Sequence, residues 1–125
     1  MLLSTKLKNL ITKASKDKDV DLEFYLKNIL VNGQKRGCSG FVKNKKNGLI
    51  VYVDTEGSVL SSLKNYVYRY ADNIKDYTGY QNRWCDTPEQ LASNICDLLT
   101  NPNEKARDIR KYDLEWALYV HEIMK

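Results

Sequence analysis

A hairpin signal between residues 38 and 54 constrains the fold more than any other feature of the chain. The segments 38–43 and 49–53 are rich in strand-forming residues, and Asn47-Gly48 lies between them. Asn-Gly favours a tight turn between antiparallel strands because both residues tolerate a left-handed backbone. An isolated hairpin is only marginally stable in water, so this one must pack on helices, gain a strand or pair with a second chain.

Helical spacing precedes the hairpin. The apolar residues of 4–14 recur at intervals of three and four, and Ser4 is a suitable N-cap. A second helix is expected after the cap Asp19, and Gly33 stands where a helix end needs a left-handed residue. The apolar face of this second helix comprises Leu22, Leu26, Ile29 and Leu30.

Three further helices are expected after the hairpin. An apolar stripe at helical spacing runs through residues 58–75, and residues 76–86 read as an aromatic loop. Thr87-Pro88 combines an N-cap with a proline at the first helical position, and Gln90 completes a capping box. Asn101-Pro102 repeats this device and opens a last helix whose apolar residues include Ala106, Ile109, Tyr112, Trp116, Val120 and Ile123.

The predicted fold class is therefore α+β, with about five helices and one β-hairpin in the order ααββααα. The 125 residues form a single compact domain over 1–125, since no linker or composition change divides them. No apolar run approaches the length of a membrane span, and the first residues are too short an apolar stretch for a secretory signal. Three cysteines at irregular spacing are typical of reduced thiols, so we expect a cytoplasmic protein without a membrane contact.

Positive charge is concentrated in the middle of the chain. Residues 35–83 carry nine Lys or Arg against four acids, whereas residues 84–125 carry five against eight. Tyrosine and tryptophan are interleaved with these cations, and this composition is typical of interface anchors. The sequence predicts a non-catalytic macromolecule-binding surface formed by Lys43, Lys45, Lys46, Arg69, Lys75, Tyr77, Tyr80, Arg83 and Trp84.

A protein or nucleoprotein is the favoured partner of this surface. Direct DNA or RNA binding by the basic hairpin and the aromatic loop is the alternative, because cations neutralise phosphates and rings stack on bases. A homodimer would form through the hairpin edge or the broad apolar face of the last helix. Alanine at Arg83 and Trp84 is expected to abolish binding and leave stability almost unchanged.

Catalytic constellations are weak in this sequence. Cys85 and the single histidine, His121, would be the pair of a small thiol enzyme, but no oxyanion turn accompanies them. Cys38, Cys85, Cys96 and His121 lack the paired spacing of zinc ligands. We therefore expect no catalytic residue, no metal and no cofactor.

The general character of the chain resembles that of small accessory proteins of phages and mobile elements. The shared features are the short length, the missing catalytic motif and a composition rich in Lys, Asn, Ile and Tyr. This resemblance implies inhibition of a host protein or nucleoprotein machine by occlusion, as anti-CRISPR proteins do.

Overall fold

The computed structural model describes residues 2–56, 66–77, 79–108 and 118–124. Five strands form one antiparallel sheet in which each strand pairs with the next along the chain. The elements of the sheet and its helices are α1 (Ser4–Ala14), β1 (Leu22–Val31), β2 (Gln34–Asn44), β3 (Ile50–Asp54), β4 (Tyr66–Ala71), β5 (Arg83–Cys85), α2 (Pro88–Leu99) and α3 (Pro102–Arg107). Residues 118–123 add one more helical segment near the C-terminus.

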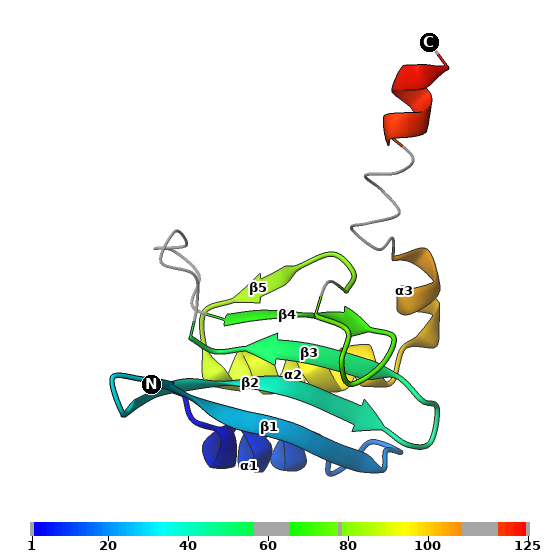
Figure 1. Cartoon of the computed structure of the whole chain (residues 1–125). Coiled ribbons are helices and arrows are strands. Elements are labelled where there is room, and N and C mark those ends of the chain that lie inside the picture. The colour runs from blue at the N-terminus through cyan, green and yellow to red at the C-terminus, as the bar shows by residue number, and fades with distance from the viewer. Residues whose placement is uncertain (1, 57–65, 78, 109–117, 125) are drawn as a thin grey trace.

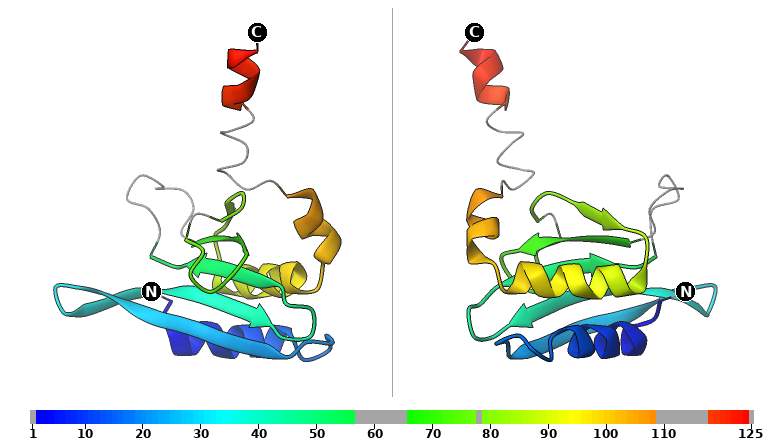
Figure 2. Two further views of the ribbon diagram at one scale, coloured as in Figure 1. Left: turned by 45° about the vertical axis from the view of Figure 1, so that its right-hand side comes forward. Right: turned by 180° about the vertical axis from the view of Figure 1, so that it is seen from behind.

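The predicted order of five helices around one hairpin is wrong. The described residues form a five-stranded sheet with four helical segments, and α1 and α2 lie on the same face of that sheet (Figures 1 and 2). The fold class is α+β, but the protein is built around a five-stranded sheet instead of a cluster of helices.

The second predicted helix is the long strand β1. Leu22 and Leu26 are four residues apart, and this separation fits one face of a helix as well as one face of a strand. The turn decides between them: Asn32 and Gly33 both have positive φ, 53° and 77°, as a two-residue hairpin connection requires. Gly33 therefore serves the β1–β2 turn and not a helix end.

The helix predicted over 58–75 is also wrong for its described part. Residues 66–71 are strand β4, and β5 lies within the segment that was expected to be a loop. Tyr66, Tyr68 and Tyr70 alternate with Val67 and Arg69, which is the period of a strand with one face on the core. Residues 57–65 lie outside the described part of the chain.

The hairpin predicted over 38–54 is confirmed as β2 and β3. Gly48 has a φ of 77°, and the amide of Asn44 donates to the carbonyl of Leu49 (2.9 Å) at the base of the turn. Strand β2 begins at Gln34, earlier than expected, because it also pairs with β1. Strand β3 has a second neighbour as well, since it pairs with β4.

The helix after Thr87 is confirmed with its cap. The Thr87 side chain accepts a hydrogen bond from the amide of Gln90 (3.1 Å), and Pro88 is the first helical residue. Asn101 caps α3 in the same way, but α3 ends at Arg107, since Asp108 has an extended backbone. The single long helix predicted after Asn101 is therefore interrupted.

The predicted helix over residues 4–14 is confirmed, although its capping differs. Ser4 is the first helical residue, and its amide donates to the side-chain oxygen of Asn28 in β1 (2.8 Å). A strand side chain thus supplies the acceptor that a free helix N-terminus needs. Leu7 and Ile11 are buried as their spacing predicts.

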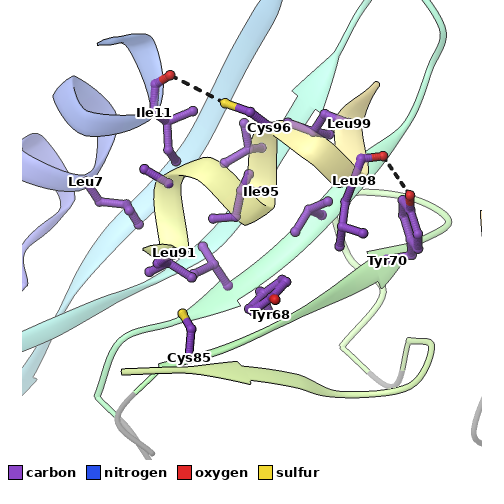
Figure 3. Close-up of a cluster of buried hydrophobic side chains, with 14 of the residues drawn as sticks. Leu7, Ile11, Tyr68, Tyr70, Cys85, Leu91, Ile95, Cys96, Leu98 and Leu99 are labelled. Carbon is purple, nitrogen blue, oxygen red and sulfur yellow. Dashed lines mark hydrogen bonds between the residues drawn. The ribbon is translucent and has the colours of Figure 1, made fainter. Parts of the chain in front are cut away.

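The core lies between the sheet and the two helices (Figure 3). The Cys96 thiol of α2 contacts the Ile11 carbonyl of α1 (3.6 Å), and the Tyr70 hydroxyl of β4 donates to the Leu98 carbonyl (2.7 Å). Each fully buried aliphatic side chain contributes about 1.5–3 kcal/mol of hydrophobic stabilisation. This layer is made of residues from both ends of the chain.

In the part of the chain that the structure describes, the helices are too short or too polar to traverse a lipid bilayer.

Candidate functional site

The helices α1 and α2 cover one face of the sheet, and among the described residues no helix covers the other face, which we call the open face (Figures 1 and 2). Strand register places Tyr25, Phe41, Tyr52 and Arg69 side by side across β1, β2, β3 and β4. Opposite residues in antiparallel strands share a face, so these four side chains form one row. The row crosses the sheet from its β1 edge to β4.

Tyr77 lies over this row and comes from the connection between β4 and β5. Its ring is 5.3 Å from that of Phe41 and 6.0 Å from that of Tyr52, with edge-to-face geometry in both pairs. Phe41 is buried beneath, whereas Tyr77 is 64% and Tyr25 is 38% exposed. The open face therefore presents tyrosine rings on a buried phenylalanine.

A buried carboxylate holds the connection that carries Tyr77. The Asp76 side chain accepts hydrogen bonds from the amides of Asp72 (2.9 Å) and Gly79 (3.0 Å). The amide of Tyr80 donates to the carbonyl of Tyr70 in β4 (3.2 Å). These bonds fix the loop against the sheet, so hydrogen bonds hold the turn that carries Tyr77 in place.

Arg69 is the cation at the β4 end of this row, in contact with Tyr52 and Tyr77. Its guanidinium lies 4.3 Å above the Tyr52 ring, and it donates to the Asn82 side chain (2.9 Å) and to the Tyr77 carbonyl. Burial lowers the pKa of Arg69 from its ordinary value, and the nearby Tyr52, Asp76 and Asp54 oppose that shift. Within the described residues its Nε has no hydrogen-bond partner and its guanidinium has no carboxylate within ion-pair distance.

The lysines at the hairpin tip are neutralised within the protein. Lys45 lies 3.7 Å from Asp21 and 3.9 Å from Glu23, and Lys46 pairs with Asp19. Lys43 has no such pair among the described residues and lies on the open face, opposite Glu23 and Ile50 in the sheet. Of the three predicted hairpin lysines, Lys43 alone has no ion pair among the described residues.

Arg83 and Tyr80 lie on the other side of the sheet. Arg83 pairs with Asp108 (2.9 Å) and Glu104 (3.2 Å) and lies over the Tyr70 ring, while the Tyr80 hydroxyl donates to Asp72 (2.7 Å). Burial by itself lowers the pKa of Arg83, but hydrogen bonds and charges from Asp108 and Glu104 outweigh it and raise the pKa. Arg83 therefore attaches the end of α3 to β5.

The predicted surface is thus divided between two faces. Arg69, Tyr77 and Lys43 meet on the open face, and Trp84, opposite Val67, lies on the same side at the β5 edge. Lys75 is exposed in the loop before Tyr77. Tyr80 and Arg83 belong to the α3 side.

Sequence reasoning missed Tyr25 and Tyr52 as members of the site. Both lie in strands and stand next to Phe41 only because β1, β2 and β3 pair in this register. The alternation of Tyr25 and Tyr52 with core residues indicates that they lie on the face opposite the core. In β1 the apolar spacing also fits a helix, so the alternation does not identify the strand.

The thiols do not have the properties of nucleophiles. Burial raises the pKa of both Cys85 and Cys96 to about 11 and raises that of Cys38 as well. A thiol with such a pKa is protonated at neutral pH and is a poor nucleophile and metal ligand. Among the described residues, no three His, Cys, Asp or Glu side chains are grouped as metal ligands.

The predicted homodimer edge is occupied. Both hairpin strands are interior strands, since β2 lies between β1 and β3, and β3 between β2 and β4. The apolar C-terminal helical segment is exposed, with Leu118, Tyr119, Ile123 and Met124 all in contact with solvent.

Searches against protein-family models, curated proteins and solved structures found no match to this chain.

Proposed function

We propose that this protein is a non-catalytic protein-binding module that docks a partner on the open face of its sheet. The observation that carries the proposal is Arg69, a half-buried cation with no carboxylate at ion-pair distance in the described chain, in contact with Tyr52 and Tyr77. Tyrosine and arginine are the residues that most often anchor protein interfaces.

The partner surface is expected to bring a carboxylate to Arg69. Each Nη of Arg69 donates one hydrogen bond within the protein and Nε is buried, so a partner carboxylate would accept from the remaining Nη–H donors, which suit the two-pronged geometry in which arginine binds carboxylates. The pair would gain from the water exclusion that Tyr77 and Tyr52 provide around it. A module of this kind inhibits its partner by covering the surface that it binds.

A protein partner is favoured over nucleic acid by the charges. Lys45, Lys46 and Arg83 are paired with carboxylates of the same chain, so three of the predicted phosphate contacts are already neutralised. The open face also carries the acids Glu23 and Asp54. Nucleic-acid binding needs several unpaired cations on one surface.

The test uses two exposed tyrosines as a matched pair. Tyr77 and Tyr119 are 64% and 56% exposed, and only Tyr77 belongs to the open face. The tagged wild-type chain, Tyr77→Ala, Tyr119→Ala and Arg69→Met are used to capture proteins from the source cell, with thermal unfolding of each variant measured in parallel. A protein captured by wild type and Tyr119→Ala but lost with Tyr77→Ala and Arg69→Met supports the proposal.

Two results contradict it. One is a captured protein that Tyr77→Ala and Arg69→Met retain as well as wild type does. The other is an electrophoretic mobility shift of DNA or RNA by the purified chain that falls steeply with salt and that these two variants leave unchanged. That result would indicate a nucleic-acid-binding protein instead.

A further inference from the structure

β1 is an edge strand with unsatisfied backbone groups. Among the described strands it pairs with β2 alone. The amide of Lys45 donates to the carbonyl of Asp21 (2.8 Å), one step beyond the Leu22–Asn44 pair of the sheet. Since hydrogen-bonded and non-bonded pairs alternate in antiparallel strands, Glu23, Tyr25 and Lys27 direct their backbone groups toward β2.

The intervening residues of β1 therefore direct their backbone groups away from the sheet. The pairing of β2 with β3 agrees with this assignment. The Asn44 amide donates to Leu49, so Asn44 and alternate residues of β2 direct their backbone groups toward β3, and the residues between them direct theirs toward β1. Within the described chain, no backbone hydrogen bond outside the strand ladders reaches these groups. The outward-facing residues are Leu22, Phe24, Leu26 and Asn28.

The outer edge of β1 is regular over this stretch. The irregularity in the β1–β2 register lies between Ile29 and Leu30, beyond the outward-facing residues. Figure 2 shows the β1–β2 turn projecting past the neighbouring strands, so β1 runs the full length of one side of the sheet. A long, regular and unpaired edge is a template for another strand.

We propose that β1 pairs antiparallel with β1 of a second copy of this chain, about a two-fold axis at Tyr25. In this register Phe24 lies opposite Leu26 of the partner subunit and Leu22 lies opposite Asn28 of the partner subunit. These are the outward-facing positions on both chains, so each pair exchanges two backbone hydrogen bonds. The two sheets then form one continuous sheet with one continuous open face.

Side-chain complementarity selects this register over its neighbours. On the open face, Glu23 lies opposite Lys27 of the partner subunit, and Lys27 lies opposite Glu23 of the partner subunit. Tyr25 meets its own copy at the axis, where cross-strand aromatic pairs stabilise. On the side of the sheet that carries the helices, the apolar Phe24 lies opposite the apolar Leu26 of the partner subunit. A shift of the axis by one residue in either direction separates Glu23 from Lys27.

A charge-reversal experiment tests the pairing. Lys27→Glu places two glutamates opposite each other, and Glu23→Lys places two lysines opposite each other, so each variant alone is expected to dimerise on the order of tenfold more weakly. An equimolar mixture restores both opposite-charge pairs in a heterodimer. At loading concentrations between the dissociation constants of wild type and the variants, sedimentation velocity then reports a mass near the 14.5 kDa of one chain for each variant and near twice that mass for wild type and for the mixture.

Lys75→Glu is the matched control. Lys75 is exposed in the connection between β4 and β5 and is not paired in register with Glu23 or Lys27, so this substitution leaves the dimer intact. The proposal is overturned if wild type sediments as a monomer at all loading concentrations. It is also overturned if Lys27→Glu and Glu23→Lys dimerise as tightly as wild type, because the contact then lies elsewhere.

Amide exchange gives a readout for individual residues. In the dimer the amides of Phe24 and Leu26 are protected as well as those of Tyr25 and Lys27. Dilution, or the Lys27→Glu variant, is expected to expose Phe24 and Leu26 selectively while the β2 ladder keeps the other two protected. Equal protection of all four amides in a sedimenting monomer, or rapid exchange of Phe24 and Leu26 in the dimer, contradicts the register.

The dimer is independent of the proposed partner binding. Lys27→Glu removes the second copy but leaves Arg69 and Tyr77 in place, whereas Tyr77→Ala does the reverse. Failure of one proposal is therefore distinguishable from failure of the other.

Discussion

Arg83 in β5 and Asp108, the residue after α3, form an ion pair of 2.9 Å in which the carboxylate side chain is only 4% exposed. Glu104 binds the same guanidinium at 3.2 Å, and hydrogen bonds from Arg107 and Arg83 lower the pKa of this carboxyl. This cluster joins the short last strand to the chain beyond α2.

Arg83→Ala is expected to destabilise the fold instead of removing a binding contact. It removes the guanidinium from the Asp108 carboxylate, whose side chain is 4% exposed, and the loss is about 3 kcal/mol of unfolding free energy. Chemical denaturation checks this value. Arg107→Ala is the control, because Arg107 is largely exposed and its bond to Glu104 is screened by solvent, so stability should stay close to that of wild type. Equal stability of Arg83→Ala and wild type would show that the cluster is not structural.

Tyr70 makes stability depend on pH in the alkaline range. Burial raises its pKa from 10.0 to about 12, so the folded protein holds this proton more tightly than the unfolded chain does. The associated stability is complete below pH 10 and declines as pH rises toward 12. Denaturation measured across this range should show the decline, and Cys85 and Cys96 contribute in the same direction.

Tyr70→Phe separates the Tyr70 contribution from those of the thiols. The substitution removes the hydroxyl donor that the carbonyls of Leu98 and Asn101 share and costs about 1–2 kcal/mol at neutral pH. The alkaline decline should become shallower than in wild type. An unchanged slope would contradict the assignment to Tyr70.

Gly40 is expected to tolerate no side chain. Its φ is 145°, and a Cβ atom there would lie 1.9 Å from the carbonyl oxygen of Tyr25 in β1. Gly40→Ala must therefore separate β1 from β2 and should cost at least about 3 kcal/mol. Gly33→Ala is the comparison: its φ is 77° but the space is open, so about 1 kcal/mol is expected. Thermal unfolding should rank the two variants in this order.

Asn44 connects three separate segments from a buried position. Its side chain donates to the Leu99 carbonyl (2.9 Å) and accepts from the amides of Asp21 and Lys46 (both 3.1 Å). Asn44→Ala removes the acceptor of the Asp21 and Lys46 amides and leaves the Leu99 carbonyl with only its bond from Asn47, and a loss of about 2–3 kcal/mol is expected in denaturant unfolding. Asn9→Ala, on the exposed side of α1, should leave stability within about 0.5 kcal/mol of wild type.

Local signals predicted the parts of the fold that depend on a few neighbouring residues. Thr87-Pro88 and Asn47-Gly48 act through their own backbone geometry, so they could be interpreted without knowing the rest of the structure. Residues 22–31 could not be assigned by apolar spacing, because Leu22 and Leu26 satisfy both periods. Asn32-Gly33 carried the same hairpin signal as Asn47-Gly48 and would have resolved it.

The candidate site was predictable only in part, for a similar reason. Arg69 and Tyr77 are close in sequence and share a surface, whereas Tyr25 and Tyr52 join them through strand pairing over long separations. Arg83 was assigned to the same surface because sequence proximity does not reveal that alternate residues of a strand face opposite ways.

The contact between α1 and α2 has a consequence for synthesis on the ribosome. The apolar side of α1 emerges first, but Leu91, Ile95 and Cys96, which cover it, follow some eighty residues later. The hairpins of the sheet can form one after another as the chain lengthens. The apolar surface that packs against the helices stays exposed to water until α2 has been synthesised. A nascent chain stalled before residue 88 would therefore present an amphipathic helix and an uncovered sheet, which are the features that chaperones recognise.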